Sequence, residues 1–198
     1  MGEWRGRGER RGVIRGQRAM LGTKVRLREK KLTDARSDYR WQADPELARL
    51  DAMPLINVSF PRYLLDYTAL MSNPSPKRHT FAIETLDGRH IGNCVYYNFD
   101  REKGEAEVGI MIGEYDCWGK GYGADAVATL ADYIFREVGL QRVYLKTLDW
   151  NGRAQRCFLK CGFIPCGQLV KNGHQFVLME MGRESWEKGR TRLKESIF

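Results

Sequence analysis

Residues 105–124 read EAEVGIMIGEYDCWGKGYGA, and this stretch decides the fold. Its first eight residues have the alternating pattern of a strand, and the apolar period from Val127 to Val138 predicts a helix soon after. The segment WGKGYGA at 118–124 joins the two elements. Its glycines permit turns that aim several backbone N–H groups at one point near the positive end of the helix. The stretch therefore predicts an anion cradle that suits phosphate.

Patterns on both sides of this stretch predict the remaining elements. Upstream, a strand at 25–30 precedes three helices, which start near Asp34, Pro45 and Pro61, and the turn at Asp87-Gly88 predicts a hairpin of 79–85 with 89–98. Downstream, we expect a strand at 143–148, a helix at 152–161 and a hairpin of 163–170 with 174–181. The order predicts an α/β chain of the α+β type, with a mixed, mostly antiparallel sheet of six to seven strands flanked by helices.

Length and composition indicate one globular domain. The chain has 198 residues, of which 42% are hydrophobic, and we place the domain at 20–182. Residues 1–19 contain six arginines and two glutamates, so we expect a disordered basic tail, and residues 183–198 form a charged C-terminal extension. Without an apolar stretch for a membrane span or a secretory signal, we expect a cytoplasmic chain. The five cysteines form no CxxC pair, and we predict no metal site.

Two other phosphate-binding loops compete for residues 118–124. The pattern GxxxxGK[ST] fails because Gly121 follows Gly119-Lys120. The dinucleotide pattern GxGxxA does fit 119–124, but six residues separate it from the strand that ends at Ile112, and several antiparallel strands come first. A dinucleotide-binding oxidoreductase is therefore a minor alternative.

Four motifs together resemble the GNAT N-acetyltransferase superfamily, in the branch similar to ribosomal-protein alanine and spermidine N-acetyltransferases. They are EVGIMI at 107–112, WGKGYGA at 118–124, NGRA at 151–154 and KCGF at 160–163. The resemblance runs from about Val25 to Met181 and implies a GNAT-like fold. It also implies an enzyme that uses acetyl-CoA as co-substrate.

The resemblance implies where acetyl-CoA binds. The loop and the start of its helix would hold the diphosphate, the backbone near the end of the preceding strand would bond the pantetheine arm like an extra strand, and Asn151 would hold that arm from the other side. Asn151 also suits a helix N-cap. Trp118 stands where the family has glutamine or arginine, and Lys120 could restore some of that charge. The predicted cofactor-binding residues are Met111, Ile112, Gly119, Lys120, Gly121, Tyr122, Gly123, Ala124, Asn151 and Phe158.

Glu107 is the predicted general base. Strand alternation places it on the face opposite Val108, and the resemblance places the family's bases on this strand. The competing interpretation is a solvent-facing carboxylate, or one that only attracts cations. The family's frequent tyrosine proton donor falls on Phe158, which cannot donate a proton, so Cys157, Tyr144 or water would have to replace it.

We expect an acetyl group to move from acetyl-CoA to a primary amine by direct attack. The acceptor would be a small amine, a polyamine or the N-terminal α-amine of a protein, and Asp44, Glu46, Asp51 or Asp66 could attract such a cation. A non-catalytic acyl-CoA-binding module is the main alternative, favoured by Phe158. The sequence leaves open a weak nucleic-acid contact by the tail and a homodimer, and it predicts no membrane partner.

Overall fold

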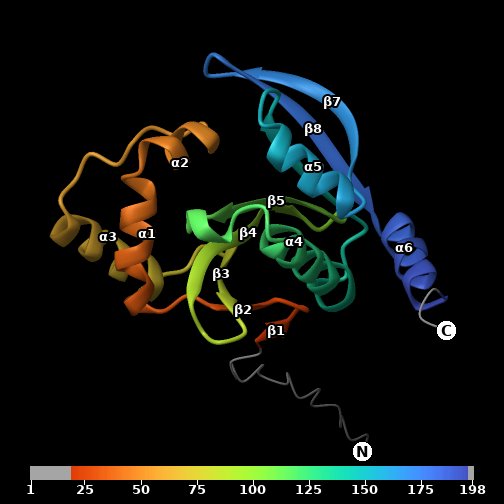
Figure 1. Ribbon diagram of the computed structural model, residues 1–198, viewed down its shortest axis with the longest axis horizontal. Coiled ribbons are helices and arrows are strands. Elements are labelled where there is room, and N and C mark those ends of the chain that lie inside the picture. Colours follow the sequence, from red (N-terminus) through yellow and green to blue (C-terminus); the bar gives the residue numbers. More distant parts are fainter. Residues whose placement is uncertain (1–18, 196–198) are drawn as a thin grey trace, which may run out of the picture.

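The computed structural model describes residues 19–195, and Figure 1 shows one twisted sheet with helices on its two faces. Eight strands form the sheet in the order β1-β2-β3-β4-β5-β6-β8-β7. All neighbours are antiparallel except β5 and β6. The strands are β1 (Met20–Leu21), β2 (Val25–Glu29), β3 (Arg78–Thr85), β4 (His90–Asp100), β5 (Glu105–Ile112), β6 (Arg142–Leu148), β7 (Ile164–Lys171) and β8 (His174–Gly182).

Helices cover the sheet unequally. Figure 1 shows α1, α2 and α3 grouped apart from α4 and α5. Short 3-10 turns at Leu32–Asp34 and Tyr115–Cys117 precede α1 and the glycine loop, and a π-helical turn at Ile134–Val138 extends α4. The helices are α1 (Ala35–Gln42), α2 (Pro45–Leu50), α3 (Phe60–Ser72), α4 (Tyr122–Tyr133), α5 (Gly152–Lys160) and α6 (Arg183–Glu195).

The main core lies between the sheet and the helices α4 and α5. Leu27, Ile83, Val143 and Phe163 are at most 1% exposed and belong to one apolar cluster with the buried face of α4. Period-2 alternation turns their strand neighbours to the opposite face. That second face is polar, and α1 packs against part of it.

Local signals predicted the turns well. Gly88 and Gly139 have φ values of 92° and 84°, which glycine adopts without steric cost, and Asn172 and Gly173 form the last hairpin turn at φ values of 52° and 76°. The sheet has eight strands against the predicted six to seven, because the structure adds β1 to the seven strands that the sequence patterns located. That strand is only two residues long and pairs Met20 with Leu27, so it carries no periodic pattern.

Both ends of the chain bear on the predicted domain limits. The expected disordered tail at 1–19 lies outside the described residues except for Ala19. The charged segment after Gly182 begins as helix α6. Trp186 of that helix packs against Phe135 with ring centroids 5.1 Å apart and donates a hydrogen bond to Asp132 at 3.0 Å. The start of the extension therefore packs on the main core.

The two parallel strands separate along their length. β5 and β6 pair through three positions, Glu105 with Arg142, Ala106 with Val143 and Glu107 with Tyr144. Both strands continue beyond this contact, to Ile112 and Leu148, without further pairing between them. A wedge-shaped gap therefore opens toward the end of β5, next to the loop that starts α4.

Candidate active site

The glycine loop has the backbone geometry that the sequence predicted. Gly119 and Gly121 have φ values of 73° and 87°, and Gly121 is the N-cap of α4. A Cβ atom built on Gly119 would meet nothing within 4 Å, so the loop is open on that side. The first N–H groups of a helix lack intrahelical partners. Tyr122, Gly123 and Ala124 lie in this first turn, whose N–H groups and dipole favour an anion.

The end of β5 exposes backbone groups to the wedge-shaped gap. The N–H of Gly113 donates to the carbonyl of Ile91 on β4 at 2.9 Å. Because backbone groups alternate between the two edges of a strand, Met111 also faces β4, while Ile112 faces the gap. The indole Nε1 of Trp118 donates to the Ile112 carbonyl at 2.8 Å, as this alternation requires. Of the two predicted backbone positions, Ile112 is therefore the one directed into the gap.

Two predicted residues of α5 lie on the far side of the gap. Asn151 is the N-cap of α5, and its Oδ1 accepts a hydrogen bond from the N–H of Ala154 at 3.1 Å. Phe158 is 6% exposed and makes an edge contact with Phe163, with centroids 5.9 Å apart. Its ring borders a small apolar cavity of about 10 Å³ that Val108 and Ile110 also line. The Phe158 ring therefore helps to form the floor of the gap.

Glu107 is a buried carboxylate with three partners. It is 6% exposed, accepts hydrogen bonds from Tyr97 at 2.7 Å and from Asn98 at 2.9 Å, and forms an ion pair with Lys146. Burial raises the pKa of Glu107, but the hydrogen bonds from Lys146 and Tyr97 outweigh burial, so its pKa lies below the usual value. A carboxylate held in this way accepts a proton less readily.

A second carboxylate on this side has the opposite shift. Asp51 is the C-cap residue of α2 and is exposed at the surface, while nearby protein groups desolvate its carboxylate. Burial raises its pKa to about 6, against the opposing charges of Arg78 and Lys146. Asp51 also acts electrostatically on Tyr97, the partner of Glu107. The sequence indicated Asp51 as a carboxylate that could attract a cation. Its raised pKa arises only from the surroundings that the fold creates.

A groove continues this polar face across β6, β7 and β8. Its volume is about 370 Å³, and its lining includes Glu107, Tyr144, Lys146, Leu169 and Leu178. Tyr144, one of the predicted proton donors, thus lies on the Glu107 side of the sheet, whereas Cys157 lies beside Gly123, on the loop side. The two replacements for the missing tyrosine are therefore on opposite sides of the sheet.

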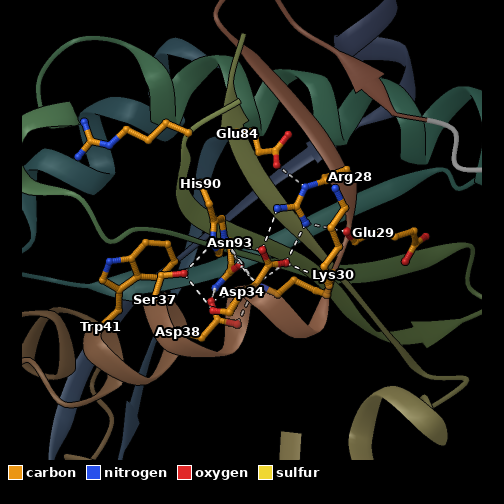
Figure 2. A network of polar contacts seen from close by, with 12 residues as sticks. Arg28, Glu29, Lys30, Asp34, Ser37, Asp38, Trp41, Glu84, His90 and Asn93 are labelled. Atoms are coloured by element: carbon orange, nitrogen blue, oxygen red, sulfur yellow. Dashed lines mark hydrogen bonds and ion pairs between the residues drawn. The ribbon is translucent and has the colours of Figure 1, made fainter. Parts of the chain in front are cut away.

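A buried polar network joins α1 to the sheet beside this site. Arg28 donates to the two carboxylate oxygens of Asp34 at 2.8 Å each, and Lys30 contacts Asp38 at 2.8 Å and the side-chain oxygen of Asn93 at 2.5 Å. Burial and the charge of Lys30 lower the pKa of His90. Asn93 is the β4 partner of Met111, so the network ends next to β5. Figure 2 shows the side chains that point toward one another, Arg28, Lys30, Asp34, Asp38, Glu84, His90 and Asn93.

Lys120 lies exposed in the loop, where its carbonyl accepts a hydrogen bond from Lys24 at 3.1 Å. Within residues 19–195 there is no group of three or more His, Cys, Asp or Glu residues that could hold a metal ion. In the same part of the chain, no helix is both long and apolar enough to cross a membrane.

Comparison with known proteins gives concordant matches. Residues 24–164 match the family model described as an acetyltransferase (GNAT) domain. An uncharacterized N-acetyltransferase of Bacillus licheniformis is 30% identical over 130 residues, which cover 65% of this chain and 72% of that protein. The family-model match extends from β2 through α5 and includes the glycine loop.

Solved structures share the fold at lower identity. The spermidine N-acetyltransferase of Vibrio cholerae in complex with CoA and spermine is 19% identical, with a TM-score of 0.74 over 83% of this chain and 98% of that one. An aminoglycoside acetyltransferase in complex with coenzyme A is 20% identical, with a TM-score of 0.69 over 84% and 99% of the two chains. At such identities the likeness shows the fold.

Proposed function

The chain belongs to the GNAT acetyltransferase family, and on that premise we propose that it transfers an acetyl group from acetyl-CoA to a primary amine. The observation that carries the proposal is the wedge-shaped gap between β5 and β6, which opens beside the glycine loop of α4. An extended polar chain can form hydrogen bonds there with free backbone groups along one edge of β5. A phosphate can bind the unpaired N–H groups at the start of α4. The residues present thus suit acetyl-CoA.

The predicted cofactor-binding residues other than Met111, whose backbone groups face β4, would then each help to hold the co-substrate. The N–H groups at 119–124 would bind the diphosphate, and the N–H of Ile112, whose carbonyl already accepts the Trp118 indole N–H, would donate to a carbonyl of the pantetheine arm. Asn151 would act chiefly by fixing the start of α5, since its side-chain oxygen already accepts the N–H of Ala154. The ring of Phe158 would pack against the pantetheine arm. Acetyl-CoA supplies an activated thioester when bound, and the protein positions it.

The reaction needs a neutral amine on the polar face of the sheet. Its nitrogen forms a bond to the acetyl carbon while the bond from that carbon to sulfur breaks; the amine proton passes to a base, and the sulfur takes up a proton. Glu107 and Asp51 are two carboxylates on this side of the sheet that both interact with Lys146. Asp51, with its pKa of about 6, is the better proton acceptor near neutral pH, whereas Glu107 is held by Lys146 and Tyr97.

The spermidine N-acetyltransferase of Vibrio cholerae is in complex with spermine. In this chain, the carboxylate of Asp51 would attract an amine that carries positive charge. We therefore propose a small amine, a polyamine or a protein N-terminal α-amine as acceptor.

Thiol release from acetyl-CoA in the presence of an amine panel tests this function. We expect turnover with at least one amine and none without acceptor. CoA binding without turnover of any amine would instead support an acyl-CoA-binding module. Thermal stabilisation by NAD(P) and not by acetyl-CoA would contradict the proposal altogether.

Two variants then separate the candidate bases. Asp51→Asn should remove the limb of the kcat/KM pH profile near pH 6 if Asp51 accepts the amine proton. Glu107→Gln should leave that limb in place and lower kcat through lost positioning. The reverse result would assign the base to Glu107. Circular dichroism of both variants controls for folding.

A further inference from the structure

Trp118 and Arg153 form a stacked pair at the entrance of the wedge-shaped gap. The guanidinium carbon of Arg153 lies 3.3 Å from the centroid of the Trp118 ring. The indole itself is fixed, because its Nε1 donates to the Ile112 carbonyl at 2.8 Å and its ring packs on Tyr115 with centroids 4.5 Å apart. Trp118 thus connects the end of β5 to the first turn of α5, with a cation on its outer face.

The stacked guanidinium keeps its hydrogen-bonding capacity. Stacking uses the face of the planar group and leaves its N–H edge available. Among residues 19–195, Arg153 has neither an ion pair nor a side-chain hydrogen bond, and its neighbour Glu46 pairs with Arg49 at 2.8 Å instead. Partial burial lowers the pKa of Arg153, whereas carboxylate partners raise the pKa of Arg28 and of Arg89. Within the described residues Arg153 therefore forms no ion pair of its own, and Glu46 acts on it only electrostatically while pairing with Arg49.

The surroundings add positive potential at the same place. Arg153 lies in the first turn of α5, where a cation opposes the helix dipole. The stacked Trp118 leads directly into Gly119 and the start of α4, and Cys157 of α5 lies 3.6 Å from a Cβ atom built on Gly123. Two helix starts and a cation are thus close together, an arrangement that an anionic ligand would stabilise.

We propose that Arg153, held on Trp118, binds the diphosphate of CoA and supplies the side-chain contact that Trp118 itself cannot make. The proposal rests on the proposed function and names a residue that determines affinity at the same site. Arg153 binds and orients the co-substrate and takes no part in proton transfer. Trp118 is a positioning residue that acts through Arg153.

Binding measurements by calorimetry test the assignment with three ligands. CoA carries the diphosphate and the 3′-phosphate, dephospho-CoA keeps only the diphosphate, and pantetheine has neither. We expect Arg153→Met to weaken CoA and dephospho-CoA alike, by roughly tenfold or more, because charge-assisted hydrogen bonds to phosphate are lost. Pantetheine affinity, measured by competition, should not change.

A matched control exists one turn further along the same helix. Arg156 is exposed on α5, and Arg156→Met removes the same charge as Arg153→Met. The CoA affinity of Arg156→Met should therefore stay within about twofold of the wild-type value. Trp118→Leu should weaken CoA in the same direction as Arg153→Met, and the double variant should be no weaker than Arg153→Met alone, since the two residues act as one unit.

Different outcomes would contradict the proposed function and the role of Arg153. Wild-type protein that binds neither CoA nor acetyl-CoA would overturn the proposed function. If the wild type binds CoA but Arg153→Met equals Arg156→Met, only the role of Arg153 is refuted. A loss confined to CoA, with dephospho-CoA unchanged, would place Arg153 at the 3′-phosphate and overturn the diphosphate assignment.

Discussion

Asp125 anchors the N-terminal strands to the start of α4, and its replacement by asparagine should be strongly destabilising. Its carboxylate accepts hydrogen bonds from the N–H groups of Thr23, Lys24 and Val25 at 3.0, 2.7 and 3.0 Å, and from the Thr23 hydroxyl at 2.8 Å. Asparagine keeps one acceptor oxygen but presents an NH₂ group to the remaining donors. The Asp125→Asn variant therefore leaves two or more donors without an acceptor.

The size of the effect follows from the partners. Hydrogen bonds to a charged acceptor contribute about 1.5–3 kcal/mol each, but the exposed donors of Thr23 and Lys24 recover water, so we expect a net loss of about 2–3 kcal/mol. Urea unfolding followed by circular dichroism would show this as a midpoint lowered by about 1 M. Asp66→Asn is the control, because the exposed pair of Asp66 with Arg62 at 3.2 Å should contribute at most about 0.5 kcal/mol.

The loss should also depend on pH in a defined direction. Burial raises the pKa of Asp125, but the backbone and Thr23 hydrogen bonds outweigh burial, so its pKa is lower in the folded chain. Its stabilisation is therefore complete above the ordinary aspartate pKa of about 3.9 and declines as the pH falls toward the folded pKa. The difference between wild type and Asp125→Asn should shrink below about pH 4. Equal stability of Asp125→Asn and Asp66→Asn at pH 7 would refute the reasoning.

Three further variants test other parts of the structure. A Cβ atom at Gly113 would lie 2.2 Å from the ring of the buried Trp41, so Gly113→Ala should cost about 1–3 kcal/mol and lower the Tm, whereas Gly182→Ala, with its nearest atom at 3.9 Å, should not. Because burial and Lys30 lower the pKa of His90, the folded state binds fewer protons there; stability should fall as the pH drops below about 6.5, and urea midpoints of His90→Gln between pH 5 and 8 should lack that slope. Glu107→Gln leaves Lys146 without its carboxylate and should cost about 2 kcal/mol in urea unfolding; adding Lys146→Met should restore part of the loss, and strict additivity would contradict the ion pair.

Sequence patterns predicted what is fixed locally. Helix starts at Pro45 and Pro61 and the glycine turns follow from backbone conformations that few other residues adopt, so α2, α3 and the hairpins appear where expected. Alternation along β5 correctly separated Glu107 from the core-facing Val108.

Contacts between distant residues could not be predicted in this way. The pairing of Glu107 with Lys146 joins residues 39 positions apart, and that of Arg26 with Glu84 joins residues 58 apart. Such pairs depend on strand register, which a single sequence does not specify. The position of Arg153 over Trp118 depends likewise on how α5 packs beside the loop. The sequence shows only that both residues are present, and their joint role emerges from the fold.

The short contact between β5 and β6 also has a kinetic consequence. In the part of the chain that the structure describes, three residue pairs join β1–β5 to β6–β8 within the sheet, and the core beneath α4 and α5 joins them elsewhere. Segments with few shared hydrogen bonds tend to open independently. We therefore expect the backbone amides of β6 and β8 to exchange with deuterium as one cooperative unit and those of β2–β4 as another. A ligand that fills the space between them should merge the two units, so exchange rates would report occupancy even where the melting temperature hardly moves.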